Sequence, residues 1–162
     1  MIKKLLVLFL FLVAGILFGC VNKEVTVHDD LLNYVNKEMQ KAYDLENVSI
    51  TAYENVSGVN YTDDFTMHQA LTKEVVPNYR DFIDELEHAD IATEELQVIH
   101  DGYVKGAKKQ LEAFELFVTA LEDQDINLVE EGNELLAEGR ELINTYVVEI
   151  EELASEHNVE WE

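Results

Sequence analysis

Apolar residues along most of this chain recur at intervals of three and four, the spacing of one face of an α-helix. The spacing predicts four helical segments, at about residues 29–56, 64–89, 94–123 and 127–157. No stretch alternates apolar and polar residues as a half-buried strand would. We therefore expect an all-α domain.

Capping residues and short connections separate these segments. Gly58 follows the first segment, Thr93 precedes the third, and Asn127 with Glu130 opens the fourth. Helices of similar length joined by short turns favour an antiparallel up-and-down four-helix bundle. Pro77 lies inside the second segment and predicts a kink or a split there, because proline removes one backbone hydrogen bond.

The N-terminus has the layout of a secretory signal. Lys3 and Lys4 precede an apolar or small run over residues 5–19, and the chain's single cysteine, Cys20, follows. The run is shorter than the roughly 20 residues that a spanning helix needs. The alternative is an uncleaved anchor helix, for which Cys20 would be incidental.

The sequence Leu17-Phe18-Gly19-Cys20 resembles the lipobox of bacterial lipoproteins, although Phe18 is bulkier than the residue usually found there. The resemblance implies cleavage of a signal peptide at 1–19 and an acyl-modified Cys20, with a short tether over residues 20–28. It places the domain on the outer face of the bacterial cytoplasmic membrane, lipid-anchored through that cysteine. An acidic tail, 158–162, would close the chain.

Two further segments, VVPNY at 75–79 and QLEAFE at 110–115, complete a wider similarity. With the lipobox, they resemble small uncharacterised helical-bundle lipoproteins of Gram-positive bacteria. Neither segment is a catalytic motif, so the resemblance implies no active site.

The charge of the chain narrows the choice of partners. Asp and Glu number 34 against 11 Lys and Arg, for a formal net charge of −23. Such a surface repels phosphate backbones, so we expect no nucleic-acid partner. A lone cysteine also excludes an intrachain disulfide, and the domain must be held together by packing.

One candidate site is a layer of tyrosines. Helical rise puts Tyr79, Tyr103 and Tyr146 at nearly the same height in an up-and-down bundle. Met39 or Ala42 would complete the layer, with His100 one turn below. The layer predicts a pocket for a small apolar or aromatic ligand. The alternative is an ordinary core layer whose hydroxyls bond backbone or reach the surface.

A weaker candidate is a cation site between the third and fourth segments. Asp123, Asp125, Asn127 and Glu134 fit positions one, three, five and twelve of a calcium loop. The sixth position should be glycine but is Leu128. The alternative is a helix–helix turn rich in capping residues.

The sequence offers no nucleophile with an evident base partner and no phosphate-binding loop. We therefore expect a non-enzymatic protein without a cofactor, acting as a surface-tethered module that binds another protein or an envelope component. The alternative is a bundle that binds a small ligand or a cation.

Overall fold

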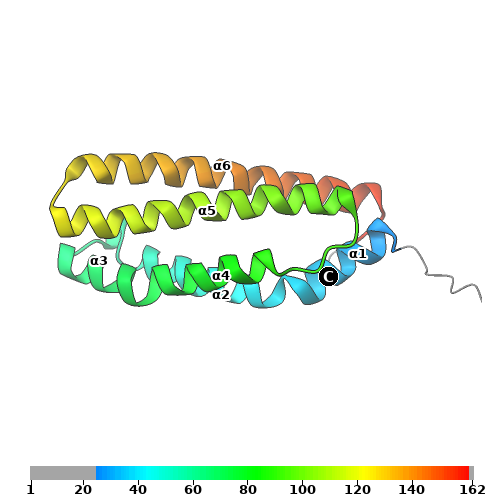
Figure 1. Ribbon diagram of the computed structural model, residues 1–162, viewed down its shortest axis with the longest axis horizontal. Coiled ribbons are helices and arrows are strands. Elements are labelled where there is room, and N and C mark those ends of the chain that lie inside the picture. Colours follow the sequence, from blue (N-terminus) through cyan, green and yellow to red (C-terminus); the bar gives the residue numbers. More distant parts are fainter. Residues whose placement is uncertain (1–24, 161–162) are drawn as a thin grey trace, which may run out of the picture.

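The computed structural model describes residues 25–160, which are all-helical with no strand among them, as the spacing of apolar residues predicted (Figure 1). The elements are α1 (Val27–Asn33), a π-helical turn (Tyr34–Glu38), α2 (Gln40–Glu54), a 3-10 turn (Gly58–Asn60), α3 (Asp64–Ala70), a second π-helical turn (Leu71–Val75), α4 (Val76–Glu87), α5 (Glu94–Asp123) and α6 (Ile126–Glu156). The expected signal peptide, Cys20 and most of the tether lie outside the described residues.

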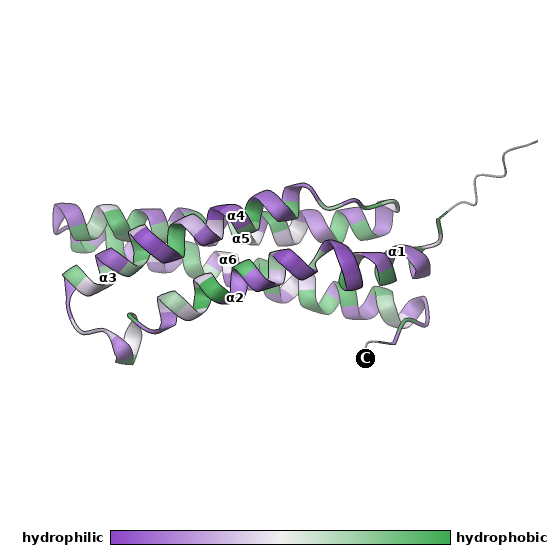
Figure 2. Cartoon of the chain, turned by 90° about the horizontal axis from the view of Figure 1, so that it is seen from below, coloured by the Kyte–Doolittle hydropathy of each residue, from purple (hydrophilic) through white to green (hydrophobic). Residues whose placement is uncertain are grey.

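The elements form a helical bundle in two layers. α5 and α6 pack side by side along their length, while α4 packs against both α2 and α5 (Figure 1). Hydrophilic residues recur along the outer faces of α2 and α4 (Figure 2). The N-termini of three helices are closed by side-chain caps, from Thr26 on α1, Asp63 on α3 and Asp125 on α6.

The first π-helical turn interrupts the regular helical spacing of residues 29–56. Leu31 and Tyr34 are fully buried there, whereas Leu32 and Val35 are only partly buried. A π-helical turn accommodates one extra residue, so the next buried position after Tyr34 is Met39, five residues on.

The second π-helical turn is how the chain accommodates Pro77. The helix neither ends nor splits at the proline, because the turn lies immediately before it and Pro77 occupies the first turn of α4. A widened turn leaves room for a residue that has no backbone N–H to donate. The buried Ser49 hydroxyl on α2 donates to the carbonyl oxygen of Val75 at 2.7 Å and ties α2 to this point.

Two glycines bring α5 and α6 close together. A Cβ atom added at Gly139 would lie 2.9 Å from the carbonyl oxygen of Gly106, and one at Gly106 would lie 3.0 Å from that of Gly139. No comparably close approach joins α2 to α6. The bundle is therefore tight along α5–α6 and looser along the α2–α6 seam.

The two ends of the described chain meet at one end of the bundle. The His28 Nδ1–H at the start of α1 donates to the carbonyl oxygen of His157, just past α6, at 3.0 Å. Asn158 adopts the left-handed conformation after α6, and Val159, within the expected acidic tail, is buried. Among residues 25–160, no helix is long and apolar enough to cross a membrane.

Candidate functional site

A histidine in the core anchors a row of hydroxyl groups. His100 on α5 is 3% exposed, and both of its ring nitrogens have partners. Nε2 lies 2.9 Å from the carbonyl oxygen of Leu86, and Nδ1 lies 2.9 Å from the hydroxyl of Tyr34. Burial lowers the pKa of His100, so the imidazole is neutral at pH 7.

Three tyrosines continue from that imidazole towards the surface. The Tyr34 and Tyr146 hydroxyl oxygens are 3.2 Å apart, and the same distance separates Tyr146 from Tyr43. Tyr34 and Tyr146 are buried, while Tyr43 is half-buried. Burial raises the pKa of all three hydroxyls, so each keeps its proton at neutral pH.

A fourth tyrosine holds a carboxylate beside this row. The Tyr103 ring stacks on that of Tyr146, with centroids 4.3 Å apart and an interplanar angle of 11°. Its hydroxyl donates to Glu46 Oε2 at 2.6 Å. Burial raises the pKa of Glu46, and the hydrogen bond from Tyr103 opposes that rise.

Four of these side chains, from Tyr43, Glu46, Tyr103 and Tyr146, meet at a pocket in the seam between α2 and α6. The pocket has a volume of about 310 Å³. Its polar lining comes from Tyr43, Glu46, Tyr103, Tyr146 and Glu151, and its apolar lining from Val35, Ile143, Val147 and Ile150. No basic residue is among the described residues that line it. The pocket therefore combines aromatic and aliphatic walls with two carboxylates.

The six residues of the expected tyrosine layer fall in different places. Tyr103 and Tyr146 line the pocket, and His100 reaches it only through Tyr34 and Tyr146. Tyr79 turns away and donates to Gln110 at 2.6 Å, between the Phe82 and Phe114 rings. Met39 and Ala42 are fully buried and do not line the pocket.

Sequence reasoning missed Tyr34, Tyr43 and Glu46. Tyr34 is hidden by the first π-helical turn, which shifts the buried face by one residue. Glu46 carries the sequence signal of a solvated helix face, like the many other glutamates of this chain. The shift shows in the five-residue spacing between Tyr34 and Met39 only once their burial is known.

The structure does not gather the expected cation ligands. Asp125 caps α6 by accepting from the backbone N–H of Asn127 at 2.9 Å, and Glu134 lies two turns further along that helix. Across residues 25–160, no group of three or more His, Cys, Asp or Glu side chains is placed to hold a metal ion. The turn between α5 and α6 thus acts as a helix cap.

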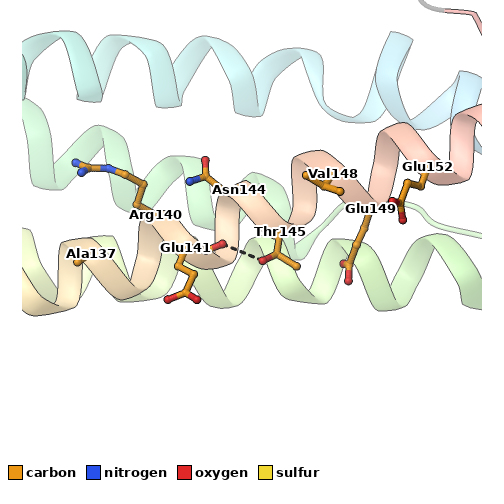
Figure 3. A pocket seen from close by; sticks show the side chains of 8 residues that line it. All are labelled: Ala137, Arg140, Glu141, Asn144, Thr145, Val148, Glu149 and Glu152. Carbon is orange, nitrogen blue, oxygen red and sulfur yellow. Dashed lines mark hydrogen bonds between the residues drawn. The ribbon is translucent and has the colours of Figure 1, made fainter.

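A larger hollow, about 640 Å³, lies along the exposed face of α6 (Figure 3). All eight side chains that line it come from α6, and the Thr145 hydroxyl donates to the Glu141 carbonyl oxygen of its own helix at 3.0 Å. A hollow with one wall does not enclose a ligand, so the α2–α6 pocket is the stronger candidate.

Apolar side chains are also exposed at the end of the bundle opposite the chain ends. Val59, Phe65 and Ile126 are 101%, 74% and 68% exposed. Ile126 lines an apolar hollow of about 410 Å³, whose lining also includes Tyr53, Tyr61, Met67, Phe117 and Leu121.

Comparison of the chain with protein-family models, with curated proteins and with solved structures found no match. Any functional conclusion therefore rests on the residues and geometry of this chain.

Proposed function

We propose that this protein is a membrane-tethered, non-enzymatic binding protein whose pocket between α2 and α6 takes a small ligand. The observation that carries the proposal is the half-buried carboxylate of Glu46, which faces this pocket without a basic partner. Among the described residues, its polar contact is the hydroxyl of Tyr103, and no ion pair involves it.

A carboxylate in that position is costly to the free protein. Burying an ionised group is unfavourable unless it is paired and hydrogen-bonded. Surface glutamates elsewhere in the chain avoid this cost, since several pair with Lys or Arg, as Glu115 does with Arg80 at 2.6 Å. Local rules of this kind are broken mostly at functional sites.

The pocket also has the character of a ligand site. Small-molecule sites are typically lined by apolar and aromatic side chains with a few placed polar groups, and have volumes from about 300 Å³ upwards. The α2–α6 pocket, at about 310 Å³, meets both criteria. The network behind it holds Tyr146 and Tyr43 in place before any ligand arrives, which lowers the entropic cost of binding.

Two further inferences concern the arrangement of the helices and the cellular location of the protein. We infer an up-and-down four-helix bundle in which α1–α2 and α3–α4 each act as one helix. A lipid on Cys20 would hold this bundle at the outer face of the cytoplasmic membrane. At least two acyl chains are needed for stable anchoring, as a modified lipoprotein cysteine would provide.

Thermal shift of the full-length protein in detergent tests the pocket. We expect some member of a panel of small amines, aromatics and cell-wall fragments to raise the melting temperature in a saturable way. Tyr103→Phe should weaken that shift, because Glu46 loses its hydrogen bond. Tyr79→Phe is the matched control, since it also removes a 2.6 Å hydrogen bond but lies outside the pocket. Equal responses from both variants would contradict the assignment of the site.

Fractionation of cells expressing the protein tests the anchor. The wild-type chain should sediment with membranes and carry an acyl mass on Cys20. The Cys20→Ala variant should lose the acyl mass. An unmodified Cys20 in membrane-bound protein would favour the uncleaved helix instead.

A second candidate function is suggested by the exposed apolar end. A protein partner with apolar and basic side chains would cover Val59, Phe65 and Ile126 and pair with the surrounding aspartates, Asp63, Asp64, Asp123 and Asp125. Crosslinking on intact cells should then lose a specific adduct in Phe65→Ser. Val98→Ser, which alters an exposed apolar residue on α5, serves as the control.

A further inference from the structure

The backbone carbonyl of Leu86 sets the direction of the whole hydroxyl row. A carbonyl oxygen only accepts, so His100 Nε2 must carry a proton and donate to it. In a neutral imidazole the other nitrogen, Nδ1, is then an acceptor. The Tyr34 hydroxyl must therefore donate to Nδ1, which uses its single proton.

The same reasoning passes from one hydroxyl to the next. Tyr34 has no proton left, so in the contact with Tyr146 it accepts and Tyr146 donates. Tyr146 has then spent its own proton, so Tyr43 donates to Tyr146. Every proton of the row points inward, from the pocket towards Leu86.

The consequence at the pocket is a wall of acceptors. Tyr43 and Tyr146 direct their protons into the core, and Tyr103 directs its proton onto Glu46 Oε2. Lone pairs on the Tyr43 oxygen and on Glu46 Oε1 receive no hydrogen bond from the described residues. Glu151 adds a second carboxylate at the rim.

We propose that the pocket binds a protonated primary or secondary amine with a compact apolar body. This inference rests on the proposed ligand-binding function of the same pocket. The ammonium group supplies the N–H donors that Tyr43 and Glu46 lack, and its charge pairs with the carboxylate of Glu46. The apolar body lies against Val35, Ile143, Val147 and Ile150.

Both the contacts in the pocket and the net charge of the chain favour an amine ligand. The charge-assisted hydrogen bond to a half-buried carboxylate is stronger than a neutral one. The aromatic rings beside Glu46 add attraction for a cation where they offer a face to the pocket. The net charge of −23 raises the local concentration of cations around the domain. A ligand with only acceptors, such as a carboxylate or a phosphate, would find no hydrogen-bond donor on this wall of the pocket.

Calorimetry on the full-length protein in detergent tests the inference with three probes that share a phenylethyl group. These are 2-phenylethylamine, its neutral counterpart 2-phenylethanol, and the N,N,N-trimethyl derivative, which is charged but has no N–H. We expect the amine to bind more tightly than either of the others. Glu46→Gln should weaken amine binding by about tenfold or more, because it removes a charge-assisted hydrogen bond while keeping an acceptor for Tyr103. Glu149→Gln removes one charge from the outer face of α6 and should leave binding unchanged (Figure 3).

The outcomes separate this inference from the function on which it rests. Equal binding of amine and alcohol would overturn the amine and leave a neutral-ligand pocket. Equal binding of the amine and its trimethyl derivative would overturn recognition through N–H donors. If all three probes and the wider panel of small molecules gave no saturable response, both the inference and the proposed pocket would fall.

Discussion

His100 Nε2 lies 2.9 Å from the carbonyl oxygen of Leu86, and this contact decides which nitrogen of the imidazole carries the proton. Its Nδ1 receives the hydroxyl of Tyr34 at the same distance. The two bonds join α5 to the last turn of α4 and to the first π-helical turn, so one side chain fixes three elements.

Replacing His100 should destabilise the fold. Gln has a donor and an acceptor, but its flexible amide does not project them at the angles of the imidazole ring, so we expect one of the two bonds to be lost. Leaving one buried polar group unpaired costs about 1–3 kcal/mol. Urea unfolding of His100→Gln at pH 7.5 should show a loss of this size. A change under 0.5 kcal/mol would mean that the network carries no net stability.

Because of His100, the folded protein should become less stable as the pH falls. Burial lowers its pKa in the folded state, so the unfolded chain takes up the proton first as the pH falls. Stability is therefore lost below the ordinary value of about 6.5, by at most about 1.4 kcal/mol per pH unit. Wild type should lose more stability than His100→Gln between pH 7.5 and pH 5.5. His88→Gln, which removes an exposed histidine, is the control and should not flatten the wild-type dependence in this way.

Asp30 should be the most sensitive carboxylate in the fold. It is 2% exposed and accepts from the Thr93 hydroxyl at 2.6 Å, the Thr93 N–H at 2.8 Å and the Ala92 N–H at 3.1 Å. Hydrogen bonds to charged groups contribute about 1.5–3 kcal/mol each, so Asp30→Ala should cost at least that much. Hydrogen exchange at Ala92 and Thr93 should accelerate in the same variant. Asp44→Ala, on the exposed face of α2, should change neither measurement.

Two glycines of α5 and α6 should respond to alanine in opposite ways. Nothing lies within 4 Å of a Cβ placed at Gly102, so Gly102→Ala should gain helix propensity of up to about 1 kcal/mol. At Gly139 the new Cβ would press on the Gly106 carbonyl oxygen, and overpacking typically costs about 1–3 kcal/mol. Thermal unfolding of the two variants should therefore shift in opposite directions. A more stable Gly139→Ala variant would show that the two helices separate easily.

Glu46→Gln should stabilise the ligand-free protein at pH 7. Burial raises the pKa of Glu46, so its ionised form opposes folding above that pKa, and the opposition fades as the pH falls towards the ordinary value. Gln keeps an acceptor for Tyr103 and removes the charge. A higher melting temperature together with weaker amine binding would be the signature of a residue kept for function at the expense of stability. A lower melting temperature would instead make Glu46 a structural residue.

The periodicity of apolar residues was enough to predict an all-helical chain, because helical spacing persists over 20 residues or more in each segment. The periodicity did not predict the pocket, and Tyr34 and Tyr79 show why. Tyr34 and Met39 share the buried face because a π-helical turn adds a residue between them. Tyr79 has the right spacing and height for the tyrosine layer, yet its hydroxyl donates to Gln110 on α5 and not towards the pocket. Hydroxyl partners depend on side-chain direction across helices, which spacing along one helix does not encode.

The hydrogen bond between His28 and the His157 carbonyl has a practical consequence for labelling. It places residue 157 beside residue 28, at the end of the bundle where α1 begins. A probe attached just after α6 would therefore report on that end of the bundle. A probe placed in the 57–62 loop, which follows α2, would lie towards the opposite end of the bundle (Figure 1). Attachment there would sample the apolar end of the bundle, and insertions made to display a second domain would use the same loop.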